Sequence, residues 1–363
     1  MIRRVIYAAI LVLTGIYVFN HLEELKLIVS TFRQGEYLWM IAAVGAHILW
    51  LVAIAASLQS TYRLSGIREN LRHLIPLTTA GNFINVVAPS YGVGAMAVFM
   101  ADGSKRGKAA GKVSTGSILY LVYDYIGFML ILPGGLIILS MRGALTPIIT
   151  ASALIAAGIA MFVFTATYLG LKNTNQLKSV LQSLTGSINR ALYFLLKREL
   201  IPAVKVDLFI KDVVSGLQGM RGSVGTLILP AVFALSRKAS AMLILYFSAM
   251  AFQVRLDGGA LFASFTIAYL FNIVSITPSG IGFVEGALTL ILNALGIPLA
   301  EAAAITMTYR GITFWLTLIY GIGAIRIIGY PLTPYRPAKA DPLPAQPPQP
   351  NEASFKRDTK LSP

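Results

Sequence analysis

Five ionisable side chains lie deep within apolar stretches of this sequence: Asp124, Arg237, Lys238, Glu285 and Arg310. An ionised side chain at the centre of a bilayer costs at least about 2.5 kcal/mol on insertion scales, so it normally faces a partner or a polar cavity. Arg310 lies ten residues into its apolar segment, which places it about 15 Å deep at the helical rise of ~1.5 Å per residue. The chemistry open to these residues is therefore ion pairing or the binding of a charged ligand.

Two interpretations of the buried charges follow from their signs. In the first, Glu285–Arg310 and Asp124–Arg237 are ion pairs that hold the two halves of the chain together. In the second, the cations face a polar cavity and attract an anionic head group. The two interpretations are compatible, because an arginine can release its carboxylate when a phosphate group arrives.

The composition indicates an integral membrane protein. Hydrophobic residues make up 56% of the chain and charged residues only 12%, roughly half the charged share of ordinary soluble domains. Several apolar stretches reach the ~20 residues that a hydrocarbon core of about 30 Å requires. The net charge of +15 comes mainly from segments between these stretches. We therefore interpret it as the bias of cytoplasmic loops and predict no nucleic-acid partner.

One motif breaks two of the apolar stretches at corresponding places. Pro-Ser occurs at 89–90 and again 189 residues later at 278–279, and glycines spaced two residues apart follow each copy. Paired breaks of this kind are typical of discontinuous helices around a binding site near the membrane midplane. The residues that we predict to form this site are Asn85, Pro89, Ser90, Gly92 and Gly94 in the first copy, Asn272, Pro278, Ser279, Gly280, Gly282 and Glu285 in the second, and Asp124, Arg237, Tyr309 and Arg310 in the spans.

Six spans and two interrupted segments must position these residues, so the predicted fold class is an all-α integral membrane protein. Each half of an interrupted segment is too short to cross alone, and we expect each segment to form a re-entrant helical hairpin. Irregular backbone at that depth is tolerated only where protein or a watery cavity covers it. The predicted spans are 4–20, 37–60, 113–140, 146–170, 225–252 and 300–328, and the interrupted segments are 76–100 and 260–296.

The distribution of lysine and arginine predicts the orientation. Both termini are expected on the cytoplasmic side of the plasma membrane. The first hairpin then enters from the cytoplasm and the second from outside, so that residues 146–328 repeat the order of 1–140 with inverted topology, within one membrane domain over 1–329. Basic residues concentrate in 61–74, 101–112 and 171–222, whereas 21–36, 141–145 and 253–259 carry few.

The glycines at the two breaks also allow two interpretations. They permit a tight break and close helix packing, or they let backbone N–H groups approach a phosphate. Half-helices that begin near Ser90 and Ser279 would point their N-terminal N–H groups into one cavity, and each helix end carries about half a positive charge. Glu285 would lie in the first turn of the second helix, where the dipole favours an anion.

The remaining segments carry less information on function. Residues 171–222 alternate apolar and basic residues, which is typical of an amphipathic helix on the cytoplasmic membrane surface, or of a solvated connector between the repeats. Residues 330–363 are rich in proline and are predicted to be a disordered cytoplasmic tail. The three histidines are too widely spaced for a local metal pair, and no metal or cofactor is predicted.

The distal motif resembles that of a known family. The Pro-Ser-Gly-Ile-Gly-Phe-Val-Glu run at 278–285, followed by Ala302–Ala304 and Tyr309-Arg310, is similar to the lysylphosphatidylglycerol synthase transmembrane, or flippase-like, family. The resemblance covers about residues 5–328. It implies a membrane domain that moves aminoacylated or other anionic lipids between leaflets. Many members carry Arg-x-Gly-Asp near the position of Pro89, and the acid and arginine of that motif are absent here.

These features predict translocation of a membrane lipid with an anionic head group, similar to aminoacyl-phosphatidylglycerol or linked to polyprenyl phosphate. No covalent chemistry and no catalytic residue are expected, and transport would be passive or driven by protons through Asp124 and Glu285. The first alternative is an intramembrane enzyme that uses one of these two acids as a base. The second is a membrane anchor for a separate transferase that docks on 171–222. Besides membrane lipids and a separate transferase, further copies of this chain are a possible partner, in a homo-oligomer.

Overall fold

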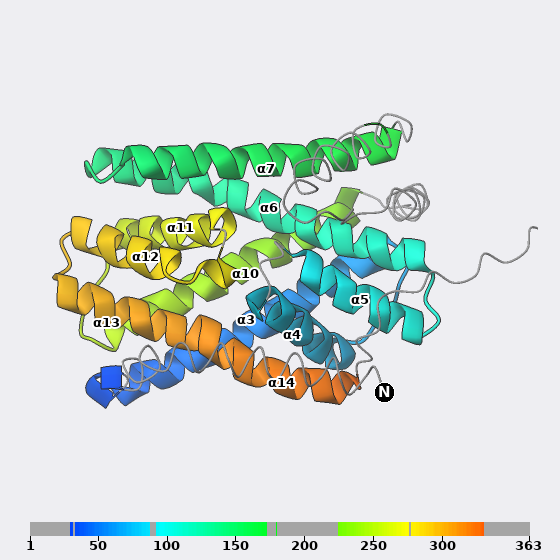
Figure 1. Ribbon diagram of the computed structural model, residues 1–363, viewed down its shortest axis with the longest axis horizontal. Coiled ribbons are helices and arrows are strands. Elements are labelled where there is room, and N and C mark those ends of the chain that lie inside the picture. The colour runs from blue at the N-terminus through cyan, green and yellow to red at the C-terminus, as the bar shows by residue number, and fades with distance from the viewer. Residues whose placement is uncertain are drawn as a thin grey trace, which may run out of the picture.

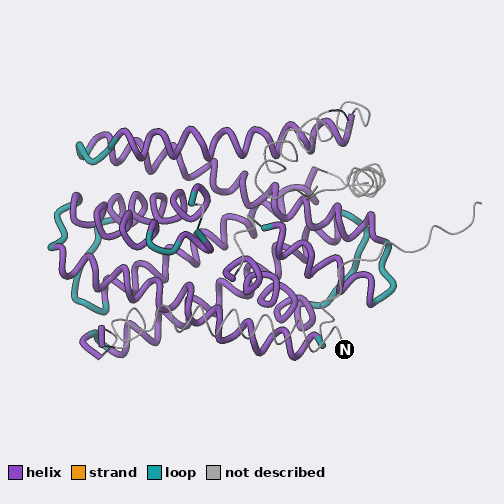
Figure 2. Tube along the Cα trace, viewed as in Figure 1, coloured by secondary structure: helices purple, strands orange, loops and turns teal. Residues whose placement is uncertain are grey.

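The computed structural model describes residues 30–31, 33–87, 92–172, 179, 224–275 and 277–329. Within these ranges every regular element is helical and no strand is present (Figure 2). The helices are α3 (Tyr37–Leu64), α4 (Leu71–Val87), α5 (Val93–Lys105), α6 (Ala110–Met141), α7 (Pro147–Lys172), α10 (Val224–Met250), α11 (Gly258–Val274), α12 (Phe283–Ala294), α13 (Leu299–Arg310) and α14 (Leu316–Ile328).

Five of the predicted spans are confirmed as helices that are long and apolar enough to cross a membrane. They comprise 37–64, 110–141, 147–169, 227–250 and 299–328. Large apolar side chains on their outer faces are exposed, for example Leu38 (72%) and Leu154 (69%). Such exposure is unfavourable in water and ordinary in lipid. The helical membrane character of the fold is therefore confirmed.

Three predicted segments lie wholly or almost wholly outside the described residues. They are the first span at 4–20, the connector at 171–222 and the tail at 330–363. Their predicted structures stay predictions.

The two interrupted segments are confirmed as pairs of short helices, and the connection within the first pair, residues 88–91, lies outside the described residues. The first pair is α4 and α5, and the second is α11 and α12. The second break contains a 3₁₀ turn, η1 (Pro278–Gly280), and its Ser279, Gly280 and Gly282 have φ of 48°, 73° and 79°. An α-helix requires negative φ, so the helical path stops here and resumes only at α12.

The two hairpins lie between longer helices and at opposite ends of the molecule (Figure 1). The α6–α7 pair runs along one long side, α13 and α14 run along the other, and α3 crosses the molecule diagonally between them (Figure 1). Near the centre of the molecule, α4 of the first hairpin contacts η1, which lies in the break of the second. The fold therefore brings two segments that are far apart in sequence to one central position.

The last span changes its helical geometry in the middle. A π-helical turn, η2 (Gly311–Trp315), separates α13 from α14. Before this turn in the sequence, α13 packs against α12; after it, α14 packs against α4. One span thus contacts both hairpins.

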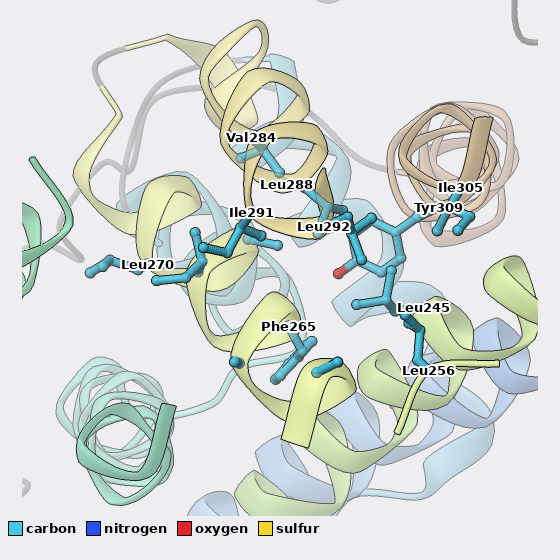
Figure 3. Close-up of a cluster of buried hydrophobic side chains, with 14 of the residues drawn as sticks. Leu245, Leu256, Phe265, Leu270, Val284, Leu288, Ile291, Leu292, Ile305 and Tyr309 are labelled. Atoms are coloured by element: carbon cyan, nitrogen blue, oxygen red, sulfur yellow. The ribbon is translucent and has the colours of Figure 1, made fainter. Parts of the chain in front are cut away.

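Two buried apolar clusters lie on either side of the centre. The first joins α11, α12 and α13 with parts of α3, α6, α7 and α10, and includes Phe265, Leu288 and Leu292 (Figure 3). The second joins α4, α5 and α14 with the other end of α3, and includes Leu77 and Phe83.

Candidate functional site

A cavity whose wall includes charged and amide side chains lies where residues of the two hairpins come together. Its volume is about 190 Å³, well above the roughly 10–15 Å³ that one water molecule needs. Both hairpins contribute to its wall, together with α3, α6 and α10. The lining residues are Trp50, Asn82, Asn85, Gly92, Tyr120, Leu121, Asp124, Tyr125, Arg237, Lys238, Tyr269, Asn272, Ile273, Ser275, Thr277 and Ser279.

Among the described residues of this wall, Asp124 of α6 is the only acidic one, and three side chains surround it. Lys238 of α10 donates a hydrogen bond to Asp124 Oδ1 and contacts the hydroxyl of Tyr269. Tyr269 of α11 donates to Asp124 Oδ2 at 2.8 Å. The Nη1 atom of Arg237 lies 3.3 Å from Asp124 Oδ1. The predicted Asp124–Arg237 pair is confirmed, and it joins the first half of the chain to the second.

Arg237 and Lys238 differ in how fully they are engaged. Lys238 is held by its two polar partners. The Arg237 guanidinium lies 4.8 Å from the centroid of the Tyr120 ring, and its buried Nε and Nη1 make no hydrogen bond in the described part of the chain. Buried donors without an acceptor are costly. Arg237 is therefore the member of the cluster whose donors are not all satisfied by hydrogen bonds, although Nη1 keeps its ionic contact with Asp124.

The charge of the wall favours an anion. Two cations, Arg237 and Lys238, face the single carboxylate of Asp124, so the ionised groups sum to +1. The other polar groups of the wall are neutral amides and hydroxyls. A monoanion would make the cavity electrically neutral, whereas a cation would add to an existing excess of positive charge.

The second predicted ion pair is also present, but its location corrects one expectation. Arg310 Nε lies 2.5 Å from Glu285 Oε1, and both residues are buried. Because they belong to α13 and α12, the pair lies within the second half and does not join the two halves. Arg310 also donates from Nη2 to the carbonyl oxygen of Ser279 at 3.2 Å, and this bond holds the second break in place.

The predicted site residues fall into groups, of which only the first lines the cavity. That group is Asn85, Gly92, Asp124, Arg237, Asn272 and Ser279. Glu285 and Arg310 support the break from behind. Gly280, Gly282 and Pro278 belong to the break itself, and Gly94 lies in the first turn of α5. Pro89 and Ser90 lie outside the described residues.

Tyr309 does not reach the cavity. It is 8% exposed and packs in the first apolar cluster, beside Leu245, Leu292 and Ile305 (Figure 3). Its neighbour Arg310 points elsewhere because successive residues of an α-helix differ by about 100° in direction. In this structure Tyr309 therefore stabilises the core and does not contact a ligand in the cavity.

The glycines of the second break have different roles. A Cβ on Gly280 would lie 3.2 Å from the Asn272 Cα atom, so this glycine permits close packing of η1 on α11. Gly282 has no atom within 4 Å of such a Cβ, and only its backbone conformation favours glycine. The helix after the break begins at Phe283 and not near Ser279. The expected first-turn position of Glu285 is confirmed.

Sequence reasoning missed several residues of the wall. Lys238 is among the ionisable residues of the apolar stretches but is not among the predicted site residues, although its position beside Arg237 is a usable signal. Tyr269 and Tyr120 carry no sequence signal, because tyrosine is common in membrane spans. Asn82 opens the first motif, and its distance of three residues from Asn85 places both on one helical face.

Comparison with known proteins identifies the family of the chain. The family model described as the lysylphosphatidylglycerol synthase TM region matches residues 4–321. This match covers most of the chain and confirms the resemblance seen in the distal motif. None of the curated proteins compared with the chain matches it.

Proposed function

The chain belongs to the lysylphosphatidylglycerol synthase transmembrane family, and from this premise we propose that it moves a lipid with an anionic head group between the leaflets of the plasma membrane. The observation that carries the proposal is the cavity between the two hairpins, whose wall has a net charge of +1 and includes Arg237, whose donors are not all satisfied by hydrogen bonds. Guanidinium groups bind phosphate strongly because their donors match two phosphate oxygens at once.

The proposed architecture is an inverted repeat with two re-entrant hairpins. The order of a span, a hairpin and a span occurs twice, as α3, α4–α5 and α6, and as α10, α11–α12 and α13–α14. The opposite placement of the hairpins in Figure 1 supports their entry from opposite faces. A cavity where two such hairpins come together suits a midplane site. The basic residues at the α5–α6 end favour a cytoplasmic location for that end.

The proposed mechanism exchanges ionic contacts. The phosphate of the head group accepts hydrogen bonds from Arg237, while Asp124 keeps Lys238 and Tyr269 as partners. Neither a buried carboxylate nor a buried guanidinium is then left alone, which keeps the cost of burial low. The acyl chains remain in the surrounding lipid, and relative movement of the hairpins opens the cavity to each leaflet in turn. No covalent step is part of this proposal, because Asp124 accepts hydrogen bonds from Lys238 and Tyr269 and lies beside the Arg237 cation, and is therefore poorly suited to act as a base.

A lipid translocation assay in proteoliposomes tests this function. Wild-type protein should move fluorescent phosphatidylglycerol to the opposite leaflet faster than fluorescent phosphatidylcholine. Arg237→Gln should remove most of this activity, whereas Arg237→Lys should retain part of it because it keeps the charge. Arg255→Gln is the matched control, since Arg255 is exposed in the loop between α10 and α11. Equal movement of both lipids by wild-type protein, or full activity in folded Arg237→Gln, would refute the proposal.

A further inference from the structure

The cavity wall also carries information on the part of the head group beyond the phosphate. Resting on the proposed function, we propose that the substrate is a phosphodiester lipid whose head group ends in a neutral, hydroxylated moiety such as glycerol or a sugar. In this proposal Arg237 binds the phosphate, and Asn82 and Asn272 bind the hydroxyl groups.

The charges of the wall exclude an ammonium head group. A primary ammonium group needs a carboxylate or several acceptor oxygens nearby. Asp124 carries the only carboxylate among the described residues of the wall, and Lys238 and Tyr269 already occupy its oxygens. An ethanolamine or lysyl head group would instead meet the positive charges of Arg237 and Lys238.

The aromatic residues of the wall argue against a quaternary ammonium group. Such a group binds in a cage formed by the faces of several aromatic rings. Here the Tyr120 ring lies 4.8 Å from the Arg237 guanidinium, and the Tyr269 ring lies 3.7 Å from Lys238 Nζ. Trp50 stacks on His47 at 5.3 Å. Since the rings of Tyr120, Tyr269 and Trp50 are already engaged by other groups, a choline head group finds no cage.

The two asparagines offer complementary groups for hydroxyls. Asn82 lies on α4 and Asn272 on α11, so the pair takes one carboxamide from each hairpin, and Asn85 of α4, whose Oδ1 accepts from Ala95 N–H, is the third in the wall. Neither the Asn82 nor the Asn272 side chain makes a hydrogen bond in the described part of the chain. A carboxamide both donates and accepts, as does a hydroxyl group. A head group with two hydroxyls therefore satisfies both amides and connects the two hairpins.

Neighbouring groups of the second break extend this neutral polar surface. Thr277 and Ser279 line the cavity beside Asn272. The Thr277 hydroxyl donates to the carbonyl oxygen of Ile281 at 2.9 Å, which fixes its orientation. A polyol fits such a surface, because it presents several uncharged donors and acceptors in a small volume.

Binding measurements with two matched lipids test the inference. Phosphatidylglycerol and phosphatidylpropanol have the same charge, but only the first carries hydroxyl groups. In native mass spectrometry or nanodisc titration, wild-type protein should bind phosphatidylglycerol about 10-fold more tightly, as expected for two added hydrogen bonds. Asn82→Leu and Asn272→Leu should each reduce that preference about 3-fold. Size-exclusion chromatography and circular dichroism of the purified variants show that they are folded.

Control variants and further lipids sharpen the test. Asn293→Leu alters an exposed asparagine at the end of α12 that donates to Ile297 and is absent from the cavity wall, and it should keep the full preference. Asn272→Asp should raise the affinity for lysylphosphatidylglycerol, because it adds the missing acceptor charge. A polyprenyl phosphohexose, tested against the unglycosylated polyprenyl phosphate monomethyl ester, identifies whether the hydroxyls come from a sugar or from glycerol.

The outcomes separate this inference from the proposed function. Preference for either hydroxylated lipid over its analogue supports the inference. Equal binding of both members of each pair, with both preferred over phosphatidylcholine, overturns the hydroxyl recognition and leaves the anion site intact. Equal binding of phosphatidylcholine and the anionic lipids overturns both proposals.

Discussion

The Glu285–Arg310 pair permits a quantitative test of the packing behind the second break. Both side chains are buried, and Glu285 Oε2 has no partner in the described part of the chain, so Arg310 alone compensates this carboxylate. Replacing either residue by an apolar one leaves the other charge buried and unpaired. Each of Glu285→Leu and Arg310→Met should therefore lower the free energy of unfolding by about 3–5 kcal/mol.

The double variant should recover most of this loss, because it leaves no buried charge. One cost remains, since the bond from Arg310 to the Ser279 carbonyl oxygen is absent in any variant without the arginine. A hydrogen bond from a charged donor contributes about 1.5–3 kcal/mol. The double variant should therefore be less stable than wild type by about that amount. The coupling energy between the two sites should then exceed about 3 kcal/mol, the upper end of values usual for neighbours.

Unfolding by SDS in mixed micelles, followed by tryptophan fluorescence, measures these differences. A double variant whose loss equals the sum of the two single losses would refute the reasoning, as would single variants within about 1 kcal/mol of wild type. Lipid binding by the double variant adds a second readout. Because neither residue lines the cavity, the preference for anionic lipid should persist.

Two further predictions concern the ends of the spans. Hydrogen bonds from Arg142, with those from the N–H groups at the start of α11, lower the pKa of the exposed Asp257 carboxyl from 3.8 to about 2. The ionised carboxylate therefore stabilises the fold above about pH 4, and this stabilisation is lost as the pH falls through about 2. The melting temperature of Asp257→Asn in detergent should depend less on pH in that window than the melting temperature of wild type. Single cysteines at Ser104 and Gly258 of this cysteine-free chain should react with an impermeant reagent only from the cytoplasmic and the outer side, respectively. Outer labelling at Ser104 would contradict the inverted topology.

Much of the helical order was predictable from the sequence. Lipid-length apolar stretches predict spans, and a Pro-Ser-Gly element predicts a break wherever it occurs. The partners of Glu285 and Asp124 were also predictable, because a buried charge requires an opposite one. These inferences rest on composition and spacing alone, and the structure bears out both pairs.

The details of the site were harder to predict because they depend on helix rotation and on distant contacts. Tyr309 was expected to belong to the site together with Arg310. Because successive residues of a helix point in different directions, its side chain lies in the apolar core instead. Tyr269 reaches Asp124 across 145 residues of sequence, and no local pattern indicates this contact. The start of α12 was misplaced because positive φ at three residues of the break delays the helix.

The π-helical turn in the last span makes its packing depend on residue count. A π-turn holds one residue more than an α-turn, and one residue corresponds to about 100° of rotation in an α-helix. The offset between α13 and α14 is what lets α13 face α12 and α14 face α4. Deleting any one residue from Gly311–Trp315 would allow a continuous α-helix and would turn one of these faces away from its hairpin. The middle of this span therefore tolerates a change of side chain more readily than a change of length.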